Sequence, residues 1–503
     1  MLATLLVFSM CGCREENLIS EATTGEIKVT IVDKGYGVEW LYEIASAYED
    51  AYEGCTVQIV EVTDPDALAA KIRTTANDND LIISTSSFFL EQYDDYLLEL
   101  TDVFDTVQDG FETKLIDRMN ESVKDYYMTE DGKFYQLPWI FGYGGLMYNK
   151  TVLDEALGTN YTLPRTSEEL IAFCQDLQTK GVYPFSLSTA VSYWSQYLVG
   201  MYFQYQGKEE YENFYRGYYL KNGEYVKATA ENFEEYLRSQ TGVLESAEVI
   251  YELLGENRFG HPESTYMNFQ EAQTAFLGLG YGDDRTPCAF MLCGDWFATE
   301  MSDAINRSGA DVRFMKLPVI SSITERLDDK TIGETELRNI ISAIDAGEDG
   351  YDGVSDADYE RLKQARFSTT STASSHVMVI PKMKNGTRKY TLTKQFINYI
   401  LSYEGQELFT YMMNGITMPY GYTAEGIYGE YADSILDAMG DKKSFTMISE
   451  GHNSPLFYVG HLDNIVGYYE GNVISDDLSP ADYFNRCVNS SLVRMNQVLP
   501  LIN

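Results

Sequence analysis

The stretch EIKVTI at residues 26–31 alternates apolar and polar side chains, which predicts a β-strand. Apolar residues then recur at helical spacing over 41–48, and a second strand-like run covers 56–62. Asp64, followed by proline, predicts the N-cap of another helix, and a third apolar run lies at 81–83. This β-α-β-α-β order predicts a parallel sheet with helices packed on it, and therefore an α/β fold.

The loops that follow two of these strands are the first candidate binding elements. Ligands of open α/β sheets bind beyond the carboxyl ends of the strands. Residues 34–37 and 84–87 occupy those positions, so their side chains are expected to face a site. The candidate polar and aromatic contacts from this part of the chain are Lys34, Tyr36, Glu39 and Ser86.

A second α/β region begins near Trp139. A strand-like run at 146–149 follows a glycine-rich loop, and Thr166 with Glu169 predicts a capping box at the start of a helix. The apolar run 288–293 predicts a buried strand. Five residues of strand span about 16 Å, which is too far for a disulfide between its two cysteines. We therefore expect the cysteines beyond the N-terminus to be buried free thiols.

Length and charge restrict the function. At 503 residues the chain exceeds the size of a single core, so two lobes are expected. The formal net charge of −40 disfavours nucleic acid as a partner, because the two would repel each other. After the first 13 residues, no stretch is long and apolar enough to predict a membrane span.

Residues 321–370 differ from their surroundings in being polar and acidic. We interpret them as an elaboration of the fold that carries one or two exposed helices. The Asp- and Gly-rich part, 345–358, does not have the ligand spacing of a calcium loop, so a loop is favoured over a calcium site.

The N-terminus resembles a bacterial lipoprotein signal. An apolar run of about ten residues is too short to span a bilayer and is typical of an export signal. It ends in Gly12 directly before Cys13, the residue expected to be lipidated, although Cys11 remains an alternative. We predict a signal peptide over 1–12 and a tether over 13–25.

Several motifs in order resemble extracellular solute-binding proteins of bacterial ABC importers, of the maltose-binding type. They begin with the strand at 26–31. The others are GKFYQLPW at 132–139, LMYNK at 146–150, LPRTSEEL at 163–170, CGDW at 293–296 and the segment 394–408. Together they cover nearly the whole mature chain apart from 321–370.

The resemblance implies a two-lobed, periplasmic-binding-protein-like fold of type II, with a hinge and an interlobe cleft. It places 26–138 and 314–412 in an N-terminal lobe, with the acidic insertion 321–370, and 139–313 and 413–503 in a C-terminal lobe. It also implies a monomer anchored by lipid on the outer face of the cell membrane, which delivers a solute to an ABC permease. Neither a cofactor nor a metal is expected.

The resemblance also implies which residues bind the solute. Tyr193 and Trp194 match the segment that supplies aromatic platforms, and Trp296 matches the tryptophan of the Gly-x-Trp motif. Trp139 lies at the predicted hinge, and Asp295 is the first candidate polar partner. Aromatic rings with polar side chains suit a sugar or oligosaccharide, whose C–H faces lie on the rings.

Two other function classes stay open. A secreted glycosidase needs only two suitably spaced carboxylates, which a chain with 77 acidic residues does not exclude. An envelope sensor would bind the same ligand without passing it on. The four histidines are scattered, without the spacing of metal ligands.

Overall fold

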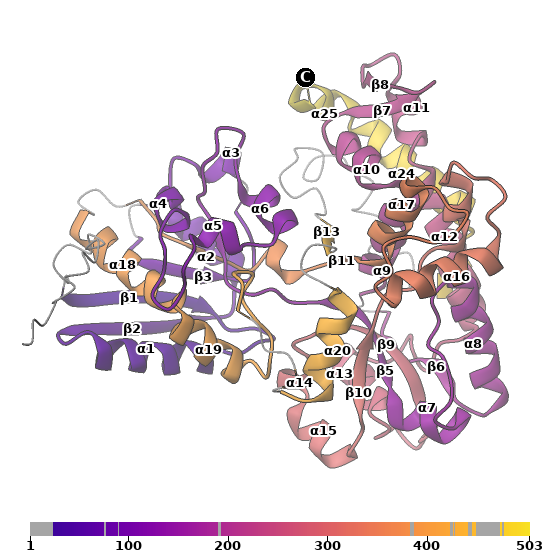
Figure 1. Ribbon diagram of the computed structural model, residues 1–503, viewed down its shortest axis with the longest axis horizontal. Coiled ribbons are helices and arrows are strands. Elements are labelled where there is room, and N and C mark those ends of the chain that lie inside the picture. Colours follow the sequence, from indigo (N-terminus) through magenta and orange to yellow (C-terminus); the bar gives the residue numbers. More distant parts are fainter. Residues whose placement is uncertain are drawn as a thin grey trace, which may run out of the picture.

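The computed structural model describes residues 24–74, 77–88, 90–189, 193–382, 387–422, 426, 428–440, 445–448, 473–474 and 477–502. The predicted signal peptide, the lipidation candidate Cys13 and most of the tether lie outside these residues. The described chain is a mixed α/β structure whose two main sheets lie in two separate lobes (Figure 1).

The first lobe is built on a five-stranded sheet of order β2-β1-β3-β12-β4. Strands β1, β2 and β3 are parallel, as the β-α-β-α-β pattern predicted, and β12 runs antiparallel to both β3 and β4. Its strands are β1 (Gly25–Val32), β2 (Cys55–Val62), β3 (Leu81–Ser84), β4 (Leu137–Pro138) and β12 (Val377–Val379).

Helices from both ends of the chain pack on this sheet. Asp64 caps α2 as predicted, because its carboxylate accepts from the backbone N–H groups of Asp66 and Ala67, both at 3.0 Å. The helices are α1 (Glu39–Ala51), α2 (Pro65–Ile72), α3 (Leu90–Tyr93), α4 (Thr101–Phe104), α5 (Leu115–Arg118), α6 (Glu121–Tyr127), α18 (Thr387–Ile400) and α19 (Tyr403–Met412).

The second lobe is built on a four-stranded sheet of order β10-β5-β9-β6, in which only β6 and β9 are parallel. Its strands are β5 (Gly144–Asn149), β6 (Tyr183–Phe185), β9 (Cys288–Gly294) and β10 (Val312–Met315). Two small pairs join β7 (Tyr218–Lys221) to β8 (Glu224–Lys227) and β11 (Ser368–Thr370) to β13 (Thr446–Ile448). The described cysteines are buried thiols that are not in disulfides, as predicted.

Most of the helices surround this second sheet. They are α7 (Lys150–Leu157), α8 (Ser167–Thr179), α9 (Trp194–Gln206), α10 (Lys208–Tyr215), α11 (Phe233–Arg238), α12 (Thr241–Leu254), α13 (Phe269–Phe276), α14 (Phe297–Glu300), α15 (Ser302–Ser308), α16 (Glu334–Asp345), α17 (Asp356–Arg366), α20 (Glu430–Met439), α24 (Pro480–Val493) and α25 (Met495–Ile502). The described residues also include the 3₁₀ turns η1 (Gly255–Asn257), η2 (Ser321–Arg326) and η3 (Thr372–Ser374). No helix among the described residues has the length and apolar character needed to span a membrane.

The cap of α8 forms only half of the predicted box. The Thr166 hydroxyl accepts from the backbone N–H of Glu169 at 3.3 Å. The Glu169 carboxylate does not return to Thr166; it accepts from the backbone N–H of Arg165 at 2.9 Å and from its guanidinium. A neighbouring arginine has therefore displaced the reciprocal bond.

The acidic segment 321–370 packs on the second lobe, whereas the family resemblance had placed it in the first lobe. Helices α16 and α17 are its two predicted helices, but the inner face of α16 is buried in the core of the second lobe. Leu337 and Ile341 are fully buried there, since an apolar helix face needs a cover that α17 and η2 supply. The segment preceding α20 also differs from its assignment, because the Tyr420 hydroxyl donates to the carbonyl of Pro138 at 2.8 Å.

The second sheet separates two hydrophobic cores. On one face, Leu146 and Leu292 belong to the core of the second lobe. On the other face, Met147 and Met291 belong to a core that continues into the first lobe. This alternation follows from the two-residue repeat of a strand. The two lobes therefore share apolar packing. It lies next to segments where the chain crosses between the lobes, which include 139–143 and 371–376.

Candidate functional site

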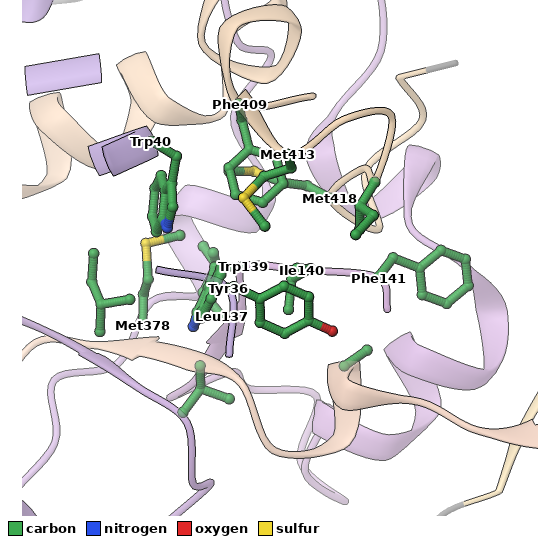
Figure 2. Packing of buried hydrophobic residues seen from close by; sticks show 14 of the residues in the cluster. Tyr36, Trp40, Leu137, Trp139, Ile140, Phe141, Met378, Phe409, Met413 and Met418 are labelled. Atoms are coloured by element: carbon green, nitrogen blue, oxygen red, sulfur yellow. The ribbon is translucent and has the colours of Figure 1, made fainter. Parts of the chain in front are cut away.

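Aromatic side chains from both lobes meet around one buried carboxyl group. We call Tyr36, Trp139, Tyr193, Asp295 and Trp296 the interlobe cluster. The Tyr36 ring lies edge-on to Trp139 and Trp296, with centroid distances of 5.8 and 5.7 Å. Trp296 in turn lies 5.4 Å from Tyr193. Figure 2 shows Tyr36 beside Trp139, where the first-lobe core reaches the cluster.

The ends of two strands place these residues. Tyr36 lies on the loop between β1 and α1 in the first lobe, and Asp295 and Trp296 directly follow β9 in the second. Gly35 allows the close approach of the two segments, because its φ is +46° and a Cβ there would lie 3.3 Å from Cγ of Trp296. Strand-end loops were the predicted location of a site, and the structure brings two of them together.

Asp295 lies at the centre of a hydrogen-bond network that links the two lobes with segments crossing between them. The Tyr36 hydroxyl donates to Oδ1 of Asp295 at 2.6 Å, and the backbone N–H of Tyr143 donates to Oδ2 at 2.9 Å. Thr372, on the second crossing, has its hydroxyl 3.0 Å from that of Tyr36. Four segments far apart in the sequence therefore meet at one carboxyl group.

The electrostatics of this carboxyl group are set by burial. Asp295 is fully buried, and desolvation raises its pKa to about 7, although the hydrogen bonds from Tyr36 and Tyr143 act in the opposite direction. Burial and the neighbouring carboxyl group raise the pKa of Tyr36 well above its usual value. No Lys, Arg or His within the described chain forms an ion pair with Asp295.

The other predicted contacts lie in different environments. Trp139 is 2% exposed; it stacks on Trp40 at 5.2 Å and donates to the carbonyl of Ser84 at 3.0 Å. Trp194 is also 2% exposed and packs between Phe185 and Tyr197, in the core of the second lobe. The structure therefore does not bring Trp194 to the cluster.

Glu39 and Ser86 also remain apart from Asp295. Glu39 is exposed at the start of α1, and its carboxylate accepts from the backbone N–H of Val38 at 3.0 Å. Ser86 is half-buried in the loop after β3, where its backbone N–H donates to the hydroxyl of Ser84. The Lys34 side chain acts electrostatically on His376, whose ring lies 5.4 Å from Tyr36.

Sequence reasoning missed Gly142, Tyr143, Thr372 and His376, which lie on two segments that cross between the lobes, at 139–143 and 371–376. A Cβ on Gly142 would collide with the hydroxyls of Thr372 and Tyr36, so only glycine fits there. The small polar run STTSTASS at 368–375, just before a strand, is the one local signal of such a crossing. Its contacts with a loop more than 300 residues away have no local signature.

A second polar region lies entirely in the second lobe. We call the groove around Lys150, Arg313, Lys316, Arg366 and Asp437 the charged groove; its volume is about 650 Å³. Each of the five cations that line it, Arg165 included, has an acidic partner, such as Asp437 at 2.8 Å from Lys316 and Asp345 at 2.7 Å from Arg366. Among the described residues, no three His, Cys, Asp or Glu side chains are grouped to hold a metal ion.

Comparison with known proteins identifies the type of domain. Residues 43–248 match the family model of the bacterial extracellular solute-binding protein. The chain contains a bacterial extracellular solute-binding domain. A search of curated protein sequences gave no match.

Solved structures share the fold over nearly the whole chain. The binding protein MsmE from Bacillus subtilis subsp. subtilis str. 168, in an open conformation, has a TM-score of 0.59 at 12% identity, covering 95% of this chain and 99% of that one. A chitin oligosaccharide binding protein has the same TM-score at 16% identity, covering 94% and 100%. The bacterial solute receptor AcbH, described as preferring β-D-galactopyranose, has a TM-score of 0.59 at 12% identity, covering 96% and 99%. The similarity confirms the predicted periplasmic-binding-protein-like α/β fold.

Proposed function

We propose that this solute-binding protein captures a sugar or oligosaccharide between its two lobes and delivers it to the membrane permease of an ATP-driven importer. The observation that carries the proposal is the meeting of Tyr36 from the first lobe with Asp295 and Trp296 from the second. A solute favours closure of two lobes only by contacting both of them. A hinge at the segments that cross between the lobes would supply that movement, as in periplasmic binding proteins.

The chemistry of the interlobe cluster supports a carbohydrate. Trp296 is only partly buried, and the faces of aromatic rings accept the C–H surfaces of sugars. Asp295 and Thr372 provide acceptors and donors for hydroxyl groups. Two structural relatives, a chitin oligosaccharide binding protein and a galactopyranose receptor, are named for the same class of ligand.

We further propose that the protein is a monomer anchored through Cys13 on the outer face of the cell membrane. The family description as an extracellular protein supports the location. The lipoprotein-like sequence at the N-terminus supports the anchor. We expect the receptor to release its solute without chemical change.

The first experiment is a thermal-shift screen of the purified protein against mono- and oligosaccharides, with amino acids and peptides as controls. A ligand that binds only the folded state raises the unfolding midpoint as its occupancy rises. A saturable shift with the sugar recovered intact supports the receptor. Hydrolysis of the sugar would instead indicate a glycosidase, and a negative sugar panel would remove the carbohydrate assignment.

A variant then locates the binding site. Trp296→Ala is expected to abolish the shift caused by the sugar. Tyr411→Ala is the matched control, because this exposed side chain on α19 lies outside the interlobe cluster. Equal binding by both variants would move the site away from the interlobe cluster.

A further inference from the structure

One pair of side chains, Tyr36 and Asp295, joins the two lobes directly. Tyr36 belongs to the first lobe and Asp295 to the second, and their atoms Oη and Oδ1 lie 2.6 Å apart. Asp295 is fully buried, so separating the lobes at this point would break the bond and expose the carboxyl group. Part of the contact between the lobes therefore depends on this one side-chain pair.

We propose that the Tyr36–Asp295 hydrogen bond is a proton-dependent latch between the lobes, closed in acid and released when Asp295 ionises. The proposal rests on the proposed function in one respect only, namely that the lobes open and close. It adds a regulation of that site, because a carboxyl group without a cation is stable in the closed contact mainly as the neutral acid.

The neutral form satisfies every polar atom of the network. Oδ2 of Asp295 accepts from the Tyr143 N–H, so a proton would reside on Oδ1 and be donated to the Tyr36 oxygen. The Tyr36 hydroxyl can then donate to Thr372, since their oxygens lie 3.0 Å apart. Closure in acid thus leaves no donor or acceptor unsatisfied.

The ionised form is less favourable in the closed contact. Tyr36 and Tyr143 still donate to the carboxylate, but burial outweighs these two hydrogen bonds and places the pKa at about 7 in the closed contact. Opening exposes the carboxylate to water, where its pKa returns toward 3.8. The closed state therefore binds the extra proton, and raising the pH favours opening.

Other ionisable groups near the latch stay in one charge state across this range. Burial lowers the pKa of His376 to about 3, so the ring beside Tyr36 is neutral. Burial raises the pKa of Tyr36 and of Tyr431, which donates to the Asp295 backbone carbonyl from α20, well above the usual value. The Cys293 thiol of β9 also has a raised pKa. Lys34 and Glu300 act on His376 and Cys293 respectively, and neither forms an ion pair with Asp295.

The test is small-angle X-ray scattering of the full chain without solute at pH 5 and pH 8.5. We expect a larger radius of gyration at pH 8.5, because the closed-to-open ratio falls about tenfold for each pH unit between the open-state pKa near 3.8 and the closed-state pKa of about 7, above which it stays constant. Asp295→Asn should keep the small radius at both pH values. Its amide can donate to Tyr36 and accept from Tyr143, and it does not ionise.

Two tyrosine variants separate the latch from general packing. Tyr36→Phe removes the bond between the lobes and is expected to give a larger radius than the parent protein at pH 5. Tyr197→Phe removes a buried hydroxyl inside the second lobe and should follow the parent protein at both pH values. Circular dichroism checks that each variant is folded.

Two results would overturn the latch: a parent protein of constant radius, or an Asp295→Asn variant that changes with pH as the parent does. Because no solute is present, a negative sugar screen leaves this experiment intact. Conversely, a protein that binds sugar but keeps one radius has the proposed function without the latch.

Discussion

The interlobe cluster and the charged groove both collect polar side chains, but they differ in how charge is compensated. In the charged groove, every cation has an acidic partner within the same lobe, as Arg366 has Asp345. In the interlobe cluster, Asp295 has hydrogen-bond donors but no cation. The charged groove therefore serves to hold one lobe together, whereas the interlobe cluster retains an unbalanced group that responds to protons and solutes.

The largest expected loss of stability comes from removing the Arg366–Asp345 ion pair of the charged groove. Arg366 is 6% exposed, makes two hydrogen bonds to Asp345 at 2.7 and 2.9 Å, and donates to the Leu317 carbonyl at 3.0 Å. Arg366→Ala should lower the free energy of unfolding by about 2–3 kcal/mol, because it removes the hydrogen bonds to the Asp345 carboxylate and leaves the Leu317 carbonyl without its donor. Urea unfolding followed by circular dichroism measures this loss.

A paired substitution is the control for that result. Replacing Arg366 and Asp345 together by Met and Leu should recover most of the stability, since no charge is then left uncompensated. Solute binding should be unchanged in both proteins. A loss of binding in the double variant would show that the groove and the interlobe cluster are coupled.

The next effect concerns pH and the interlobe cluster. Because the folded-state pKa of Asp295 is raised to about 7, the folded protein holds a proton that the unfolded chain releases near pH 4. The contribution of Asp295 to stability therefore falls as the pH rises from 4 to 7. Asp295→Asn should remove this slope and raise the free energy of unfolding at pH 8 by about 2 kcal/mol. Parallel pH profiles for the two proteins would contradict this account.

A smaller effect is expected from the other side of the same bond. Tyr36→Phe should lower the free energy of unfolding by about 1 kcal/mol at pH 5, the usual net value of one hydrogen bond. The Tyr197 hydroxyl has no hydrogen-bond partner among the described residues, so Tyr197→Phe should lower the free energy of unfolding by less. Thermal unfolding of the three proteins in one buffer compares them directly.

The smallest change in stability is expected from a substitution at the rim of the charged groove. Arg313 pairs with Glu430 at 2.5 Å, but the Glu430 side chain is 70% exposed. Arg313→Ala should change the free energy of unfolding by about 0.5 kcal/mol or less, and salt should reduce that difference further. A loss comparable to that of Arg366→Ala would mean that exposure does not separate the two pairs.

The sequence determined the local structure and the type of domain. Alternating residues at 26–31, the Asp64 cap and the apolar run at 288–293 correspond to β1, α2 and β9, because strand periodicity and capping depend on neighbours in the chain. The ordered motifs also pointed to an extracellular solute-binding domain, which the family match confirms. The placement of Tyr36, Asp295 and Trp296 at strand ends could likewise be predicted from the sequence.

Tertiary structure decided which of these residues meet. Trp194 and Trp296 were equal candidates in the sequence, but helix α9 turns Trp194 into a core while the end of β9 leaves Trp296 at the lobe boundary. Helix α16 packs on the second lobe because its apolar face is buried in the core of that lobe. The Tyr36–Asp295 bond joins residues 259 positions apart, and the pKa of Asp295 depends on desolvation by all the segments around it. Burial and long-range contact are properties of the assembled chain, so no local pattern could have specified them.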